Sequence, residues 1–132
     1  MLQSGLVFAG ANVSLQNDTG EGIVTALDLS GLDLKGMDLV VLSACETGKV
    51  DPNNTNGVSG LTKAFIQAGA NDVVMSLWKV SDKETSSLMQ AFYQTGKDNK
   101  GRYANALKQS KLAMIEKGLH PYYWAAFVLS GL

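Results

Sequence analysis

The sequence predicts an α/β fold with a mostly parallel sheet. Residues 38–43 form a short apolar run rich in β-branched side chains and without polar alternation, which is typical of a strand buried on both faces. From this run onward the patterns alternate in the order strand, helix, strand, helix, helix, strand. The chain has 132 residues, of which 45% are apolar and 17% charged, so it fits one domain with its own core.

The first 37 residues and the segment after the buried strand predict the following elements. Residues 6–11 are expected to form a short strand, and residues 23–32 a strand that leads into a helical turn. The segment 46–56 is rich in Gly, Pro, Asn and Asp and is expected to be a loop. Apolar residues spaced by three and four predict a helix over 57–68, and Gly69 is well placed as its C-terminal cap.

The remaining residues predict a second strand, two helices and a last strand. Residues 73–78 are apolar and are expected to form another buried strand. The capping-box sequence 81–84 predicts the start of a helix that continues to Gly96. After a polar loop, a helix is predicted over 102–117, and the final strand over 123–130.

Composition excludes several classes of function. The net charge is −1, so the basic surplus of a nucleic-acid-binding protein is absent. Two lysines and seven acidic residues precede residue 63, whereas nine basic and five acidic residues follow, which we interpret as two differently charged faces. One cysteine excludes an internal disulfide and a multi-cysteine zinc site, and we expect no cofactor or metal. No signal peptide or apolar membrane span is evident, so we expect a cytoplasmic protein.

Cys45 is the candidate nucleophile. It follows the first buried strand directly, and ligands of open α/β sheets bind at the carboxyl ends of strands. A lone cysteine beside a buried strand can equally be a small core residue. The surrounding Ser43-Ala44-Cys45-Glu46-Thr47-Gly48 is similar to the caspase signature Gln-Ala-Cys-x-Gly, with one more residue before the glycine.

The wider match is to the CHAT family, caspase-like domains found with TPR repeats in bacteria. Four segments resemble the family in the same order along the chain, and they cover most securely residues 38–132. They are Leu39-Val40-Val41-Leu42-Ser43-Ala44-Cys45-Glu46-Thr47-Gly48, Gly60-Leu61-Thr62-Lys63-Ala64-Phe65 with Ala68-Gly69-Ala70, Ser76-Leu77-Trp78-Lys79-Val80-Ser81-Asp82, and His120-Pro121-Tyr122-Tyr123-Trp124-Ala125-Ala126-Phe127.

The resemblance implies a three-layer α/β/α fold and a clan CD cysteine endopeptidase, related to separase, that acts on a protein or peptide. Cys45 matches the nucleophile of a Cys–His dyad, and its backbone N–H matches one oxyanion-hole donor. Asp82 matches the acid that forms a pocket for a basic side chain in separase, and Trp78 and Ser76 match the edge of that pocket. Asp82 would also be favourable simply as an acid in the first turn of a helix.

The histidine of the dyad departs from the family pattern. In the family it lies about 50 residues before the cysteine, and residues 1–119 contain no histidine. We therefore expect the chain to begin just after this histidine, to lack the N-terminal strands of the domain, and to be inactive alone. His120 precedes the last strand, which we expect to be parallel to 38–43. His120 and Cys45 would then lie at opposite edges of the sheet, too far apart for proton transfer, so we exclude His120 as the base and interpret it as a turn residue before Pro121.

Two further functions and one association remain open. The edge of the strand Asp38–Ser43 would lose its neighbour, so we expect self-association or a partner chain there. The alternative to a peptidase is a non-enzymatic interaction module derived from the CHAT fold. A third and weaker hypothesis is a small-molecule or phosphate-binding domain, since Gly57-Val58-Ser59-Gly60 begins a predicted helix, whose N-terminus attracts anions. The segment lacks the spacing of a P-loop, which argues against this hypothesis.

Overall fold

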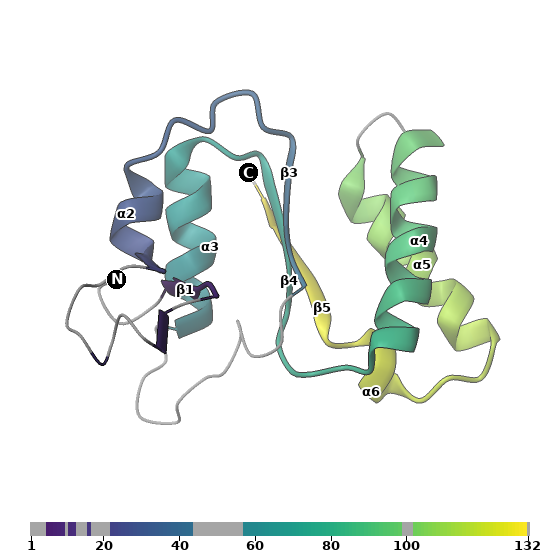
Figure 1. Cartoon of the computed structure of the whole chain (residues 1–132). Coiled ribbons are helices and arrows are strands. Elements are labelled where there is room, and N and C mark those ends of the chain that lie inside the picture. The colour runs from purple at the N-terminus through teal and green to yellow at the C-terminus, as the bar shows by residue number, and fades with distance from the viewer. Residues whose placement is uncertain are drawn as a thin grey trace.

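The computed structural model describes residues 5–9, 11–12, 16, 22–43, 57–98 and 102–131, with the side chains of 57–59 left aside. A three-stranded sheet forms the middle layer, and helices cover both of its faces (Figure 1). Helices α2 (Ala26–Ser30) and α3 (Gly57–Ala68) lie on one face. Helices α4 (Asp82–Asp98), α5 (Tyr103–Glu116) and α6 (Pro121–Trp124) lie on the other. The predicted three-layer α/β/α fold is therefore confirmed.

The sheet has the order β3-β4-β5 and mixed direction. Strand β3 (Leu39–Leu42) is parallel to β4 (Asp72–Ser76), whereas β5 (Phe127–Gly131) is antiparallel to β4. The expectation that the last strand is parallel to the first is wrong. The carboxyl ends of β3 and β4 and the amino end of β5 consequently meet at one edge of the sheet, because Leu42 pairs with Met75 and Ser76 pairs with Phe127.

The domain has two hydrophobic cores, one on each face of the sheet, and successive residues of β4 contribute to them in turn. Val73 is fully buried among residues of α2 and α3, while Val74 is fully buried among residues of α4 and α5. This follows from the alternation of side chains along a strand, and it explains why the strand is apolar on both faces. In β3 every residue is only partly buried, because the strand lies at the edge of the sheet.

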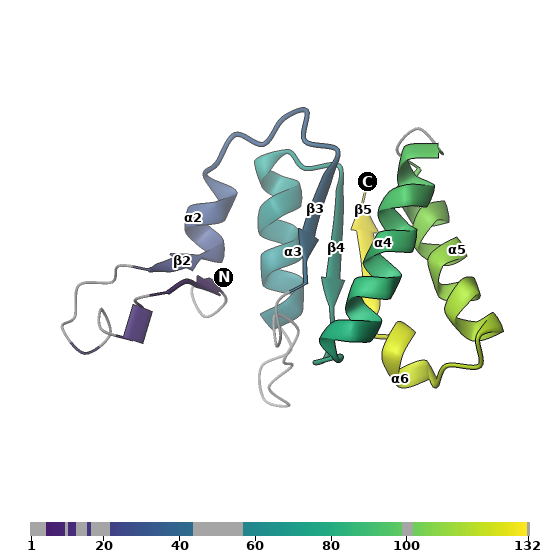
Figure 2. The ribbon, with the colours of Figure 1, turned by 45° about the vertical axis from the view of Figure 1, so that its right-hand side comes forward.

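The N-terminal segment forms a separate hairpin. Strands β1 (Gly5–Val7) and β2 (Ile23–Thr25) pair in antiparallel fashion and lie beside α2, apart from the central sheet (Figure 2). Strand β2 leads directly into α2, as predicted for 23–32. The helix begins with a capping box in which Thr25 and Asp28 bond each other's backbone N–H. The strand predicted over 6–11 is shorter and begins one residue earlier.

Helix α3 has the predicted bounds, and Gly69 ends it with φ +111°. A Cβ at Gly69 would lie 2.8 Å from the backbone nitrogen of Lys35, so glycine is required there for two reasons. The predicted helix 102–117 is α5, and α4 extends two residues beyond Gly96. The last strand starts later than predicted, because 121–124 form α6 with Pro121 at its first turn, where proline is favoured.

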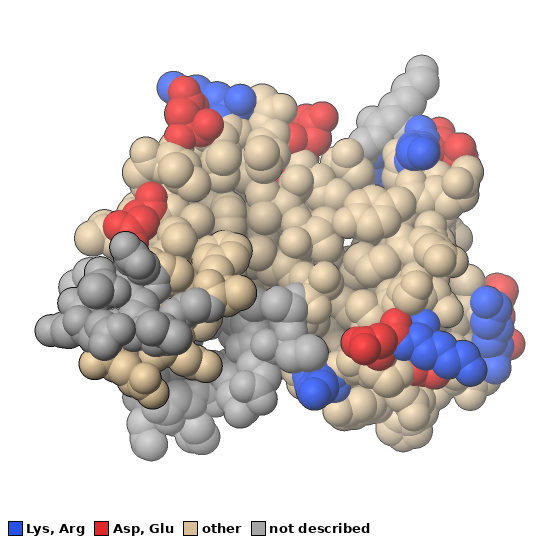
Figure 3. Space-filling model, in the orientation of Figure 1, with Lys and Arg blue, Asp and Glu red and all other residues tan. Residues whose placement is uncertain are grey.

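Charged side chains of both signs occur together on the surface. In the view of Figure 3, Lys and Arg lie next to Asp and Glu in most of the charged clusters on this face. This face therefore presents mixed charge rather than one sign. None of the helices in the described parts of the chain is both long and apolar enough to cross a membrane.

Candidate active site

The candidate nucleophile segment leaves the sheet at the end of β3. Leu42 is the last residue of β3, and Ser43 is exposed beyond it. Cys45 and the predicted loop 46–56 lie outside the described residues. The structure thus fixes the edge of the sheet from which this segment departs, namely the carboxyl edge of β3 and β4.

Ser76 ends β4 at the same edge. It is 4% exposed and shares the face of Val74, because side chains alternate along the strand, so it faces the layer of α4 and α5. The neighbouring Met75 faces α3, where its sulfur accepts a hydrogen bond of 3.4 Å from the Thr62 hydroxyl. Ser76 therefore lies next to the strand that carries the cysteine segment, but it is buried rather than open to solvent.

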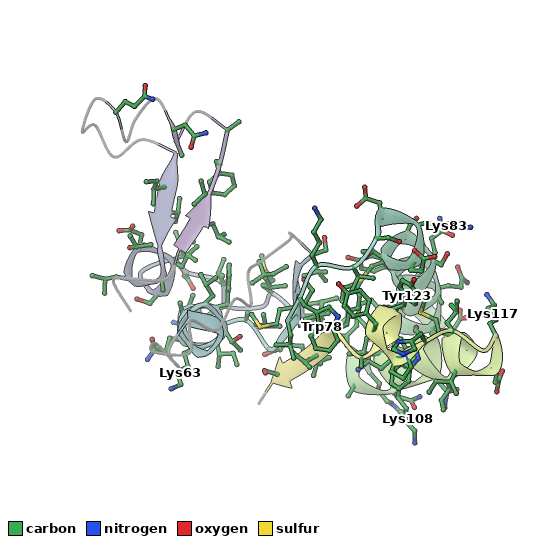
Figure 4. All side chains as sticks on the ribbon, turned by 90° about the horizontal axis from the view of Figure 1, so that it is seen from below. Lys63, Trp78, Lys83, Lys108, Lys117 and Tyr123 are labelled. Carbon is green, nitrogen blue, oxygen red and sulfur yellow. The ribbon has the colours of Figure 1, made fainter. Side chains whose placement is uncertain are left out.

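Trp78 stands just beyond Ser76 and is fixed to α6. Its indole N–H donates to the carbonyl of Tyr122 at 2.9 Å, and the two rings lie 6.0 Å apart with an interplanar angle of 32°. The Tyr122 hydroxyl donates in turn to the carbonyl of Lys79 at 2.7 Å. Figure 4 shows Trp78 beside α6, close to Tyr123. We call the three residues Trp78, Lys79 and Tyr122 the wall of the site.

Asp82 begins α4 four residues after Trp78, at the same edge of the sheet. Its side chain is exposed, as a residue that meets a basic substrate group requires. An acid in the first helical turn is also stabilised by the helix dipole, so the position alone does not separate the two roles. The structure brings Ser76, Trp78 and Asp82 to one edge of the sheet, which is the edge from which β3 leads to Cys45.

His120 lies at this edge too, and the reason given for excluding it is therefore wrong. Since β5 is antiparallel, the segment before it is on the same side as the carboxyl ends of β3 and β4. His120 is the N-cap of α6, and its Nδ1 accepts a hydrogen bond of 3.2 Å from the backbone N–H of Tyr122. The imidazole is exposed and already has a structural partner.

Tyr122 is a site residue that sequence reasoning missed. Its partners Trp78 and Lys79 precede it by 44 and 43 residues, and nothing in the local pattern indicates that these segments meet. Knowing the direction of the last strand would have revealed the contact. Because β5 is antiparallel to β4, the segment before it, which contains Tyr122, lies at this edge of the sheet.

Among the described residues, the carboxyl group with a raised pKa lies away from this edge of the sheet. Asp72, at the opposite end of β4, has a raised pKa because it is partly buried and then because Asp38 lies nearby. Among the residues that the structure describes, no three His, Cys, Asp or Glu side chains gather in a way that could hold a metal ion.

The fold and this edge define an α/β domain with a candidate site at the carboxyl ends of two parallel strands. The model of the CHAT domain matches residues 1–132, and the chain belongs to this caspase-like family. It is similar to tetratricopeptide repeat protein 28 from Mus musculus, with 34% identity over 114 residues. The same protein from Homo sapiens is 33% identical over 112 residues. Each match covers 84% of this chain and 4% of the relative, so the chain spans a small part of their length.

Proposed function

We propose that this chain is the part of a CHAT-type cysteine endopeptidase that carries the nucleophile Cys45 and one wall of the substrate pocket. The observation that supports the proposal is the shared edge. Strand β3 leads to Cys45 at one edge of the sheet. At the same edge, the Trp78 indole is hydrogen-bonded to Tyr122, and Asp82 is the first residue of α4. A nucleophile, an apolar wall and an exposed carboxylate at one strand edge suit a peptide with a basic side chain before the cut.

In this reaction the Cys45 thiolate attacks the scissile carbonyl, and the peptide C–N bond breaks to leave an acyl-enzyme. A histidine donates a proton to the leaving amine and later takes one from the water that releases the acyl group. The backbone N–H of Cys45 would stabilise the oxyanion. Trp78 would contact the substrate chain, and Asp82 would pair with the basic side chain before the cut.

The proposal assigns the histidine of the dyad to residues outside this chain. The chain has one histidine, His120, whose Nδ1 caps α6. A cysteine without an activating partner has a pKa of about 8.5 and is mostly protonated at neutral pH. We therefore expect this chain alone to leave peptides uncut. We expect His120 to cap α6, the helix that holds Trp78, rather than to transfer a proton.

The test uses fluorogenic peptides with Arg or Lys before the cut. We expect the 132-residue chain to show the same rate as Cys45→Ala, and a longer protein that also contains the preceding segment to show turnover that Cys45→Ala abolishes. Asp82→Asn in the longer protein should weaken cleavage after Arg and Lys more than cleavage after Gln. Turnover by the 132-residue chain that depends on Cys45 would contradict the assignment of the base.

The open edge of β3 supports a second part of the proposal, namely association through this strand. In the described sheet β3 pairs only with β4, although its residues Leu39–Leu42 are apolar. Unpaired backbone groups on such an edge recruit another strand, from a second copy or from the preceding part of the parent protein. Hydrogen exchange should show protection of the β3 amides that rises with protein concentration, with β5, the other edge strand, unchanged. Equal exchange at all concentrations and a monomer by light scattering would contradict self-association.

The relatives favour one alternative, a non-enzymatic interaction module. Both are tetratricopeptide repeat proteins, and such repeats in the parent protein would fit a domain that binds other proteins. If the longer protein carries a histidine in the family position and still leaves every peptide uncut, the interaction module replaces the peptidase as the function.

A further inference from the structure

Helix α5 carries apolar residues on two sides, and only one of them faces the core. The inward side is buried and consists of Ala106, Leu107, Ser110 and Met114. On the other side, Leu112 is 39% exposed and Ile115 is 44% exposed. A helix that covers a core from one side normally presents polar residues outward, so a second apolar stripe needs its own explanation.

The outward stripe forms one wall of a hollow with the indole of Trp124. The hollow has a volume of about 340 Å³, and Trp124 closes it from α6. The Trp124 N–H already donates to the carbonyl of Leu119 at 3.2 Å, so the ring offers carbon surface to the hollow. The residues around it are Ala104, Leu107, Lys108, Lys111, Leu112, Ile115 and Trp124.

The charges at this hollow have one sign. Lys108 and Lys111 are the charged residues of the lining, and no acidic side chain is among the described residues that form it. Figure 4 shows Lys108 on the outer side of α5, pointing away from the sheet. Lys111 is partly buried, and burial lowers the pKa of its ammonium group, because partial removal from water disfavours the charged form. A carboxylate of a partner would favour the charged form.

We propose that this hollow is a docking site for an acidic amphipathic helix of a partner protein. The partner places bulky apolar side chains against Leu112, Ile115 and Trp124, and carboxylates next to Lys108 and Lys111. The residues of α5 that line the hollow run from Ala104 to Ile115, which is about 17 Å along the helix or three helical turns. An open surface of this length, with apolar and basic side chains, fits an acidic amphipathic helix laid along it.

A second copy of the chain fits less well. Two-fold pairing through the same surface would bring Lys108 and Lys111 of both copies into one contact, with no acidic residue of the lining to pair with them. Like charges brought together at a contact are unfavourable. The charges of the hollow therefore favour a different, acidic occupant.

The experiment measures binding of synthetic helical peptides to the complete chain by fluorescence anisotropy. The peptides share leucines along one face and carry Glu, Lys or Gln beside them; another has Glu with alanines in place of the leucines. We expect the Glu–Leu peptide to bind best, by about tenfold over the Lys–Leu peptide, with an affinity that falls as salt rises. The alanine peptide should bind far more weakly.

Variants of the chain test whether the hollow is responsible. Lys108→Glu with Lys111→Glu should reverse the preference toward the Lys–Leu peptide, and Leu112→Ser should weaken both. The matched control is Lys83→Glu, an exposed lysine on α4 that lies away from Lys108 (Figure 4). Circular dichroism establishes that each variant is folded.

Three results would overturn the proposal. One is that none of the leucine peptides binds at concentrations up to about 1 mM, because a specific site should have a Kd below this value. Another is that acidic and basic peptides bind equally, or that the double lysine variant binds as the unchanged chain does. The third is self-association that Leu112→Ser abolishes, which would assign the hollow to a second copy.

Discussion

The cap of α6 offers the most direct test of the role of His120. Replacing His120 by alanine removes the Nδ1 acceptor that lies 3.2 Å from the Tyr122 backbone nitrogen. The backbone N–H then turns to water, since this position is exposed. Loss of an N-cap acceptor costs about 0.5–2 kcal/mol, and solvent access places the expected loss in the lower half of that range, at about 1 kcal/mol.

Asparagine is the matched variant, because its side-chain oxygen can accept the same hydrogen bond and it is among the most favourable N-cap residues. Urea denaturation followed by circular dichroism should show a lower midpoint for His120→Ala and an unchanged or higher midpoint for His120→Asn. The corresponding fall in Tm for the alanine variant is about 2–5 °C for a domain of this size. Tryptophan fluorescence should change in the alanine variant, because α6 holds the indole of Trp78.

Two outcomes would refute this reasoning. If His120→Asn is as unstable as His120→Ala, the acceptor is not what His120 contributes. If both variants keep their stability but abolish turnover in the longer protein, His120 is the base of the dyad, and the assignment of that histidine to another part of the protein is wrong.

Four further substitutions test the packing and the caps. Phe92→Ala should lower the free energy of unfolding by about 3–5 kcal/mol, because this ring is fully buried in the core beneath α4, as chemical denaturation would show. Gly118→Ala should cost about 1–2 kcal/mol, since its φ is +71° and the space beside it is open. Gly69→Ala should cost more, because its Cβ also meets backbone at 2.8 Å; equal losses would contradict the steric argument. Hydrogen bonds from the Thr25 side chain and then its backbone lower the pKa of Asp28, so its contribution is present above about pH 4 and is lost as pH falls through the lowered pKa. Asp28→Asn should remove this acid-dependent step from a pH titration of Tm.

The elements that show a clear pattern within their own segment could be predicted from the sequence. The apolar run at 38–43 predicts β3 because a strand covered on both faces needs no polar alternation. Residues 57–68 predict α3 with the right bounds, since the helical spacing stops where Gly69 takes a positive φ. In each case the residues that determine the element lie within it or directly beside it.

The direction of β5 and the wall of the site depend on distant residues and could not be read in the same way. Trp78 and Tyr122 look like separate aromatic residues, and their contact exists only because β5 is antiparallel to β4. The error about His120 had the same origin, since the assumed direction of one strand placed it at the wrong edge. The short helix α6 was also missed, although Pro121 is a known residue of first helical turns.

The bond between Trp78 and Tyr122 has a consequence for the order in which the domain folds. Strands β3 and β4 and Trp78, in the connection between β4 and α4, precede Tyr122 in the sequence, and Trp78 does so by 44 residues. Contacts of such separation require a long loop to close and therefore form late. During synthesis, β3, β4 and the indole of Trp78 emerge before Tyr122, the residue that holds this indole. This edge of the sheet is therefore completed only when the final strand turns back, so that formation of the candidate site coincides with completion of the fold.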